Sequence, residues 1–349
     1  MNRPLRARLL LLLVLLVGTA LRLFRLGADS LWYDETVSTL LAGSPLPELI
    51  RHTAGDIHPP LYYMLLRGWL IAMGYPAGRA DAHGIGLEFS AAFFSLFFGV
   101  LLIALTYVLA RRFAGARVAL IAAALVAFSP YHIWYGQEVR MYTLGAGLGV
   151  VATLALAMGI VRHMSHVKRQ ASLGWWAIYA VAAAAGMYTL YYFAFLLVAL
   201  NVWGLVRLIL ATFDRRPPVD DRRPLTADRR LTTIDRRPPT ADRRLTHDVS
   251  RLTHDARRLT HDARRLTFDV APLFLANLAA ALFYAPWIPI AWRQATDPPV
   301  PPWRTAPTFL ASVSESWNAL ALGQSAPPWT WPVAAALIGI YAAGLVALV

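Results

Sequence analysis

Long apolar blocks constrain the fold of this chain more than any other feature of its sequence. Runs of about 15 to 25 mostly apolar residues recur along it, and a bilayer core needs about 20 per helix. Hydrophobic residues make up 57% of the chain and charged residues 15%. In soluble proteins, apolar residues average about 45–50% and charged residues about 25%. These observations predict an all-α multi-pass membrane protein and exclude a soluble enzyme or a disordered chain.

Eight segments are apolar enough to be predicted as membrane spans. They are residues 9–24, 89–109, 118–133, 142–161, 175–188, 191–210, 272–291 and 331–349. The first follows a cluster of arginines, but no A-x-A cleavage site comes after it, so we interpret it as an uncleaved helix. The last ends inside an apolar run, which indicates a truncated or fragmentary product.

Charge predicts the orientation of these spans. Lysine and arginine gather on alternate connections, which the positive-inside rule makes cytoplasmic, together with the N-terminus. Outside residues 214–269 the chain has ten acidic residues, all in or beside the other connections. A transporter is expected to keep carboxylates inside its helices, and the predicted spans contain almost no ionisable residue. We therefore expect a protein of the cell membrane with its polar chemistry on the extracytoplasmic side.

The composition divides the chain into three regions: residues 1–213 and 270–349, both predicted to be transmembrane, and 214–269 between them. The middle region holds 15 Arg and 10 Asp and includes six tandem units of seven residues from 224 to 265. Prolines predict disorder in its first half, and the second half has only a thin heptad seam. We interpret it as a solvated cytoplasmic insert, in contact with anionic lipid at most and without a catalytic role.

The connection at residues 27–86 is near 60 residues long, and loops of such length are usually functional. Within it, residues 60–74 are too short to span with Arg67 at their middle. We predict an amphipathic helix lying in the membrane interface, with Tyr62, Tyr63 and Trp69 at headgroup level.

Asp34 and Glu35, in the segment SLWYDE, are the strongest candidates for chemistry. Desolvation and like charge raise the pKa of one of two adjacent carboxylates, and a carboxylate tuned in this way can remove a proton from an attacking hydroxyl. The alternative is structural, because Asp34 or Glu35 would also suit the start of a helix over residues 36–42.

Further candidates are polar or aromatic residues in the predicted outer connections. His58, in HPPLYY, suits a phosphate or a carboxylate, with an exposed turn as the alternative. Gln137, Glu138 and Arg140 lie in one short connection. Arg140 suits a phosphate, and the alternative is a snorkelling arginine paired with Glu138. Tyr191, its tyrosine neighbours and the segment 284–289 are expected to form aromatic belts, with substrate stacking as the alternative.

The sequence lacks the motifs of several common kinds of site. There is no glycine-rich nucleotide loop, no HExxH motif and no zinc spacing. Without cysteine the chain can form no disulfide, thiolate metal site or cysteine nucleophile. We predict no metal site and no nucleic-acid partner.

Three of these segments together resemble a known family. SLWYDE, HPPLYYMLLRGW and WYGQEVRMYTL, in this order and spacing, are similar to bacterial family 39-type membrane glycosyltransferases of the GT-C superfamily. These are relatives of protein O-mannosyltransferases and of the lipid A aminoarabinose transferase. The resemblance covers roughly residues 9–210 and 272–292. It implies a GT-C transmembrane bundle with a large first extracytoplasmic loop that carries interfacial helices.

The resemblance also implies a reaction and roles for individual residues. The donor would be a polyprenyl-phosphate-linked sugar, and the acceptor a glycan, lipid or protein hydroxyl, with inversion at the anomeric carbon. Asp34 would be the base, with Glu35 beside it, and Arg140, Gln137 and Glu138 would lie near the phosphate. His58, Tyr62 and Tyr191 complete the expected substrate-binding set. Ala92 stands where similar sequences often carry an arginine, so an inactive glycan-binding relative is the alternative, ahead of a lipid or solute transporter.

Overall fold

The computed structural model describes residues 3–75, 86–165, 172–214, 269–297 and 308–322, together with Ala335. These parts of the chain form helices and connecting turns, with no strand among them. The predicted heptapeptide repeat and, apart from Ala335, the predicted last span, 331–349, lie outside the described residues. The helices are α1 (Arg3–Leu23), α2 (Tyr33–Gly43), α3 (Leu46–Gly55), α4 (Leu61–Ala72), α5 (Leu87–Phe128), α6 (Pro130–Gln137), α7 (Tyr142–His163), α8 (Leu173–Thr189), α9 (Phe193–Asp214), η2 (Ala285–Trp287), α11 (Ile288–Thr296) and α12 (Phe309–Leu322).

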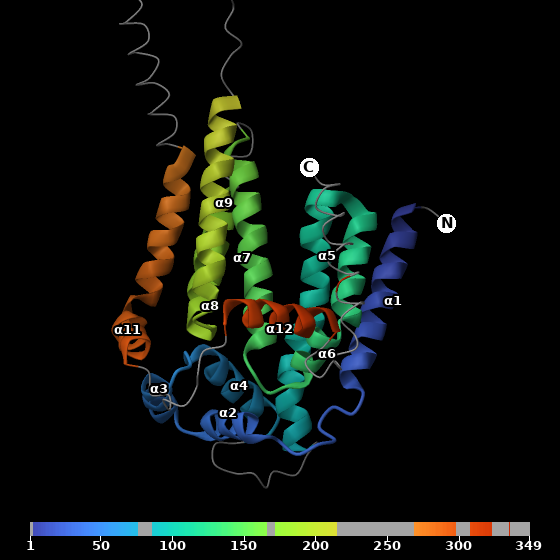
Figure 1. Ribbon diagram of the computed structural model, residues 1–349, viewed down its shortest axis with the longest axis vertical. Coiled ribbons are helices and arrows are strands. Elements are labelled where there is room, and N and C mark those ends of the chain that lie inside the picture. The colour runs from blue at the N-terminus through green and yellow to red at the C-terminus, as the bar shows by residue number, and fades with distance from the viewer. Residues whose placement is uncertain are drawn as a thin grey trace, which may run out of the picture.

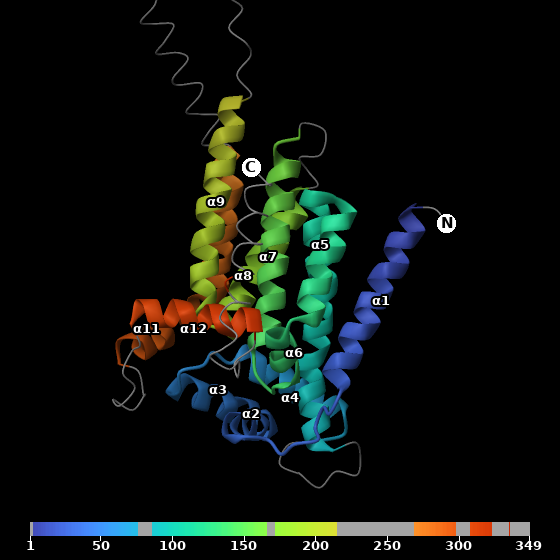
Figure 2. The same cartoon turned by 45° about the vertical axis from the view of Figure 1, so that its right-hand side comes forward.

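The helices form an upright bundle with a layer of short helices across one end (Figure 1). The bundle consists of α1, α5, α7, α8, α9 and the helix that begins at Asp269 and leads into η2. The short helices α2, α3, α4 and α11 make the layer, which we call the loop layer, and α12 runs across the bundle beside α6 (Figure 2).

Four helical segments of the described chain are long and apolar enough to cross a membrane. They are Leu87–Phe128, Tyr142–His163, Phe193–Ala211 and Asp269–Thr296. The predicted spans 9–24 and 175–188 also form helices, but α1 carries several arginines and α8 has only 17 residues. The architecture is that of an α-helical membrane protein.

The predicted spans 89–109 and 118–133 both fall in α5, which doubles back on itself (Figure 1). The reversal lies at Gly115, whose φ of 80° is in the left-handed region that glycine adopts without a steric penalty. Arg111, Arg112 and Arg117 surround this turn. It therefore sets a basic end of the bundle opposite the loop layer.

The second half of α5 ends at Phe128 and not at residue 133, as the sequence suggested. Ser129 is the N-cap of the next helix, where its Oγ accepts from the His132 backbone N–H at 3.4 Å, and Pro130 occupies the first turn. A proline at that position removes the donor that would continue the α5 ladder. The break separates α6 from the span and leaves the last α5 carbonyls without helical partners.

Arg22 of α1 supplies those partners. Its guanidinium donates to the Ala127 and Val126 carbonyls, both at 3.0 Å, and the side chain is fully buried. Glycines make room for it, because a Cβ on Gly99 would lie 3.3 Å and one on Gly136 3.2 Å from the Arg22 Nε. Arg22, an ionisable residue inside the first predicted span, is therefore a buried cation that caps the end of another helix.

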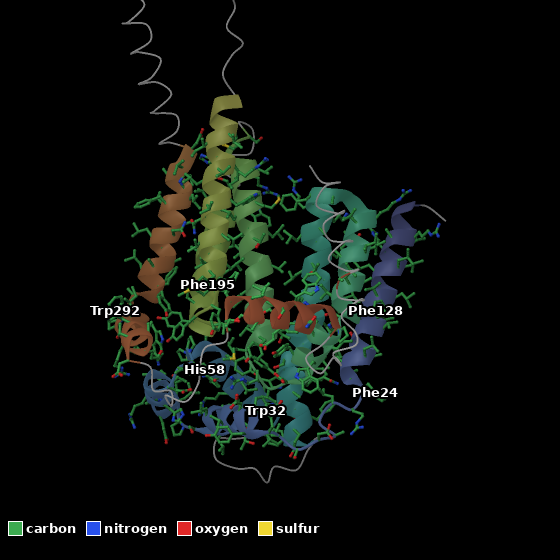
Figure 3. All side chains as sticks on the ribbon, viewed as in Figure 1. Phe24, Trp32, His58, Phe128, Phe195 and Trp292 are labelled. Atoms are coloured by element: carbon green, nitrogen blue, oxygen red, sulfur yellow. The ribbon has the colours of Figure 1, made fainter. Side chains whose placement is uncertain are left out.

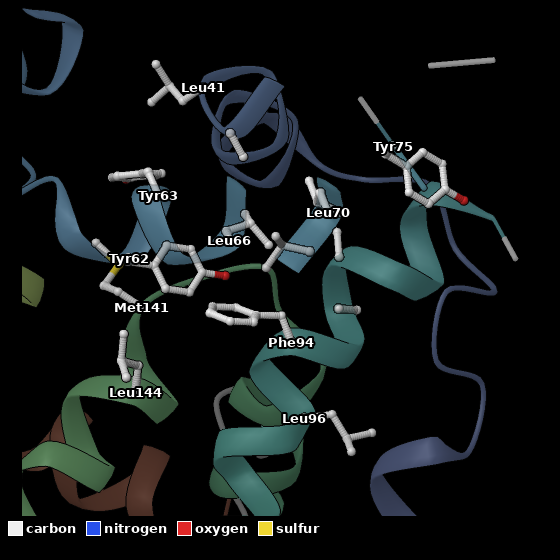
Figure 4. Packing of buried hydrophobic residues seen from close by; sticks show 14 of the residues in the cluster. Leu41, Tyr62, Tyr63, Leu66, Leu70, Tyr75, Phe94, Leu96, Met141 and Leu144 are labelled. Atoms are coloured by element: carbon white, nitrogen blue, oxygen red, sulfur yellow. The ribbon is translucent and has the colours of Figure 1, made fainter. Parts of the chain in front are cut away.

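The predicted interfacial helix forms as α4, but its aromatic residues do not face lipid headgroups. Tyr62 is buried against Phe94 of α5 (Figure 4), and its hydroxyl lies 3.1 Å from the Ser95 Oγ. Tyr63 is buried as well and packs edge-on against the Tyr62 ring. Trp69 donates to the Ser90 carbonyl at 2.8 Å and stacks on Phe93. The helix is apolar on the side that packs on α5, so its aromatics form core rather than an interfacial belt.

A polar cluster joins three helices within the bundle. The Asn201 amide donates to the Asn277 side-chain oxygen at 3.1 Å, and the Asn277 amide donates to the Asn201 oxygen at 2.7 Å. The Tyr179 hydroxyl of α8 donates to the same Asn277 oxygen at 3.3 Å. Amide pairs of this kind hold apolar helices in register, because a slip would leave the polar groups unpaired.

Candidate functional site

A cavity of about 1180 Å³ lies where the loop layer meets the bundle. Four of the residues singled out from the sequence line it: Asp34, His58, Arg140 and Tyr191. Figure 3 shows His58 at this junction. The cavity is therefore the place where the first long connection, the α6–α7 turn and the α8–α9 turn come together.

Asp34 and Arg140 form an ion pair on one wall of the cavity. Asp34 stands in the first turn of α2, where Ser38 donates its hydroxyl to the Asp34 carbonyl. The Asp34 Oδ2 is 3.6 Å from the Arg140 Nη2, longer than a direct hydrogen bond. The Arg140 side chain is only 7% exposed, whereas that of Asp34 is 37% exposed. A reachable carboxylate thus lies beside a fixed, buried cation.

His58 connects Arg140 to a second carboxylate. Its Nε2 lies 3.3 Å from the Arg140 Nη2, and its Nδ1 lies 3.2 Å from the Asp56 Oδ2. A guanidinium has only donors, so Nε2 must be the acceptor and Nδ1 carries the proton that it donates to Asp56. This chain of contacts assigns a neutral tautomer to His58 and orients the guanidinium.

The charge of Arg140 is held in place by its surroundings. Burial lowers the pKa of Arg140, but the neighbouring Tyr63, Tyr142 and Asp34 raise it, and the net shift is upward. The guanidinium carbon also lies 5.9 Å from the centre of the Tyr142 ring, which contributes a cation–π attraction. Its Nε is buried without a hydrogen-bond partner in the described part of the chain. Arg140 is therefore a permanent cation with unused donor capacity beside the cavity.

Glu35 has turned away from this cavity. One carboxylate oxygen accepts from the Val139 backbone N–H at 2.9 Å, and the other accepts from the Trp32 backbone N–H at 3.2 Å. It is buried, and it ties the start of α2 to the residue before Arg140. The structure places Glu35 as a clamp that brings Asp34 and Arg140 to the same wall.

Gln137 and Glu138 line a smaller cavity of about 210 Å³, which also contains Glu35 and Ala92. The Gln137 amide donates to the Arg22 and Phe24 carbonyls at 3.1 and 2.8 Å, so it fastens α6 to the end of α1. Glu138 accepts from the Trp134 indole at 2.6 Å, and not from Arg140. Burial raises the pKa of Glu138, with Glu35 adding to the effect.

Tyr62 does not reach the cavity, but its neighbour Tyr63 does. Both are on α4, and successive helical residues point about 100° apart, so only one of them faces the ligand space. Burial raises the pKa of Tyr63 to about 12. Tyr63 is a lining residue that the sequence reasoning had assigned to the interface.

The wall opposite Arg140 comes from the α8–α9 turn and from the segment that contains η2 and α11. Tyr191, Tyr284 and Gln294 line it. Tyr284 and Trp287, expected to form an aromatic belt, are buried instead. The sequence reasoning missed Gln294, because a glutamine next to Arg293 on a short amphipathic helix carries no motif. The one signal available was the Pro286–Pro289 spacing, which breaks the span and turns α11 into the loop layer.

Asp56→Asn is expected to lower the melting temperature at neutral pH, and to make less difference as the pH falls. The hydrogen bond from His58 lowers the pKa of Asp56 below its ordinary 3.8, with burial opposing it. A depressed folded-state pKa gives stability that is fully present above about pH 5 and is lost as the pH falls through the folded value. The Asp56 side chain is 37% exposed. We therefore expect the substitution to lower the free energy of unfolding at neutral pH by at most about 1 kcal/mol.

Melting curves of the purified protein between about pH 3 and pH 7 would measure this effect. Asp297→Asn, at an exposed carboxylate outside the cavity, is the matched control. An equal loss of stability for Asp56→Asn at every pH would contradict the His58 assignment.

Comparisons with known proteins add no neighbour to this picture. No protein-family model, no curated protein and no solved structure matches the chain. No group of three or more His, Asp or Glu side chains suited to a metal ion occurs in the described ranges. The cavity and the sequence motifs that line it therefore define the candidate site.

Proposed function

We propose that the protein is an integral-membrane glycosyltransferase. It moves a sugar from a polyprenyl-phosphate donor to an acceptor hydroxyl on the extracytoplasmic side, with inversion at the anomeric carbon. The observation that carries the proposal is the meeting of Asp34 and Arg140, far apart in the sequence, at 3.6 Å on the wall of one large cavity. The cavity lies opposite the basic turn around Gly115, and the positive-inside rule assigns that turn to the cytoplasm.

The proposed reaction needs a base and a cation on either side of one carbon. The acceptor oxygen forms a new bond to the anomeric carbon while its proton moves to the Asp34 carboxylate. The bond from that carbon to the phosphate oxygen breaks, and the polyprenyl phosphate leaves with an additional negative charge. Arg140 stabilises this charge with oriented donors, which His58 and Asp56 hold in position.

An apolar recess beside the cavity suits the polyprenyl chain. It has a volume of about 280 Å³, lies between α6, α7 and the start of α9, and shares Tyr142, Leu190 and Tyr192 with the main cavity. Its other lining residues include Phe193 and Leu196. A lipid tail in this recess would place its phosphate next to Arg140, because Tyr142 contacts both spaces.

The resemblance described above supports the same assignment. The three motifs that carry it contribute Asp34, His58 and Arg140, and these converge on the cavity. In our proposal Asp34 is the catalytic base and Arg140 binds the phosphate. Glu35, Gln137 and Glu138 act as positioning residues rather than through contact with the substrate.

A glycan-binding protein without turnover is the second candidate, and Ala92 favours it. Ala92 is buried and lines the small cavity with Glu35 and Glu138, with no arginine at its position. Without an arginine at position 92, those carboxylates share the small cavity with Arg25, which pairs with Asp29. A turnover assay separates the two candidates, because binding alone releases no sugar from the lipid.

The test is release of radiolabelled sugar from a panel of polyprenyl-phosphate sugars by membranes that contain the chain. Arg140→Lys is expected to lower the turnover number about 100-fold, because an ammonium keeps the charge but loses the planar fork that pairs with phosphate. Arg51→Lys, on the exposed face of α3 outside the cavity, is the matched control. Turnover by Arg140→Lys at the rate of the control would rule out the phosphate assignment, and absence of turnover with every donor would favour the second candidate.

A further inference from the structure

The cavity is larger than one ligand needs. Pockets for single small ligands are about 300–1,000 Å³, and this one reaches about 1180 Å³. The proposed donor site occupies the wall with Asp34, His58 and Arg140. The opposite wall, with Tyr191, Tyr284 and Gln294, has no role in that proposal and is free for a second molecule.

The opposite wall is rigid, because most of its polar groups bind one another. The Tyr191 hydroxyl accepts from the Trp287 indole at 2.9 Å and donates to the Gln294 side-chain oxygen. The Gln294 amide donates to the Thr53 and Ala54 carbonyls at 2.8 and 3.1 Å, at the C-terminal end of α3. This network fastens α11 to α3 and to the α8–α9 turn, so the wall is a prebuilt surface rather than a mobile one.

Tyr284 is the exception in this network. Its side chain is buried, with 8% of the residue exposed, and its hydroxyl has no hydrogen-bond partner among the described residues. The ring packs edge-on against the Tyr188 ring, with the two ring centroids 4.9 Å apart. A buried hydroxyl without a partner is costly, and a ligand that bonds to it removes that cost.

The composition of the lining indicates the kind of ligand. Six of the twenty residues that line the whole cavity are tyrosines, and two of them, Tyr191 and Tyr284, belong to this wall. A tyrosine offers an apolar ring face and a hydroxyl, which match the C–H faces and the hydroxyl edges of a pyranose. Arg140 is the only Lys or Arg in the described lining, and it belongs to the other wall. The Tyr284 wall therefore suits a hydroxylated, uncharged ring better than an anionic headgroup.

A peptide acceptor fits this wall less well. An extended peptide needs free backbone groups to pair with, but the wall is helical. The α3 carbonyls nearest to it already accept from Gln294 and, at Ala54, from Arg293 as well. The groups on this wall that lack a full set of partners among the described residues are the Tyr284 hydroxyl, which is itself buried, and one lone pair of the Gln294 oxygen. A sugar hydroxyl can bond to either kind of group.

We propose that the wall formed by Tyr191, Tyr284 and Gln294 is the acceptor subsite and that it binds a sugar ring, so that the acceptor is a glycan. The choice of acceptor rests on the proposed glycosyltransferase function, whereas the presence of a sugar-binding wall does not. The α11 helix thereby determines which acceptor enters.

Binding of methyl pyranosides to the full chain in lipid nanodiscs, followed by saturation-transfer NMR without donor, tests the subsite directly. Tyr284→Phe removes only the hydroxyl and is expected to weaken binding about threefold to tenfold, the effect of one lost hydrogen bond. Tyr188→Phe is the matched control, because its hydroxyl donates to the Phe283 carbonyl and the residue does not line the cavity. Equal binding by wild type, Tyr284→Phe and the control would overturn the proposal.

Transfer kinetics separate the acceptor from the donor. Tyr284→Phe should raise the KM for a glycoside acceptor by the same factor, with the turnover number little changed. A rise in the donor KM instead would assign the ring to the donor's own sugar, and transfer to a Ser/Thr peptide but to no glycoside would also overturn the proposal. If no donor is turned over while pyranoside binding depends on Tyr284, the proposed function fails and the sugar site stands.

Discussion

Asp34→Asn is expected to lower the rate of sugar transfer about 10²–10⁴-fold, the usual contribution of a general base. The amide is nearly the same size as the carboxylate but cannot take the proton from the acceptor hydroxyl. Because Asp34 is 37% exposed and contributes only one side of a 3.6 Å ion pair, its loss should leave the fold intact. The turnover number for release of sugar from the lipid is the quantity to measure.

Asp29→Asn is the matched control for this substitution. Asp29 belongs to the same connection, is 83% exposed and pairs with Arg25 on the surface, at a distance where the contribution to stability is small. We expect its turnover to equal that of the wild type. Turnover by Asp34→Asn at the wild-type rate would remove the base from Asp34, and Glu138, whose pKa burial raises, would then be the next carboxylate to test.

Arg22→Met is expected to destabilise the protein by about 3–4 kcal/mol. The methionine fills most of the space but leaves the Val126 and Ala127 carbonyls at the end of α5 without donors. The buried guanidinium of the wild type also costs free energy, because it has lost its hydration, and the substitution removes that cost. The expected destabilisation is therefore smaller than the summed free energies of the lost hydrogen bonds. Denaturant or thermal unfolding of the purified protein measures the change.

Thr19→Val gives the comparison on the same helix. Thr19 donates only to the Leu15 carbonyl of its own helix, at 2.7 Å, so its replacement should change stability by less than about 0.5 kcal/mol. If Arg22→Met is as mild as Thr19→Val, the end of α5 does not depend on the guanidinium. A secondary loss of activity is expected as well, because Gln137 fastens α6 to the backbone of Arg22.

The helices of the bundle could be predicted from sequence because length and hydropathy decide them. Seven of the predicted spans correspond to described helices, with ends that differ by a few residues. The exception at the end of α5 has a local cause, since Ser129 and Pro130 form a helix start that the hydropathy of residues 118–133 conceals. The packing of α4 into the core was not predictable, because its apolar face suits a membrane interface and a neighbouring helix equally well.

The candidate site could be predicted in part, through residues whose chemistry is unusual for their place. Asp34, His58, Arg140 and Tyr191 all line the cavity. Glu35 does not, because the N–H groups of Trp32 and Val139 take both of its oxygens, and that depends on a turn about 100 residues away. Tyr284 lay in a segment expected to form an aromatic belt, with substrate stacking as the alternative. Gln294 was missed, because its place in the cavity wall depends on the meeting of distant helices, and periodicity and spacing carry no sign of that.

The amide pair of Asn201 and Asn277 bears on how the length of the segment between its two helices can change in evolution. From that pair α9 continues for 13 residues to Asp214, and the partner helix begins eight residues earlier, at Asp269. At 1.5 Å per residue the two ends stand about 20 and about 12 Å from the pair, at the same end of the bundle. Lengthening the link from five residues to the present 54 adds only about 2 kcal/mol of closure entropy. Duplication of a seven-residue unit at this junction is thus nearly neutral for the fold, and it leaves the cavity of the proposed site, at the opposite end of the helices, untouched.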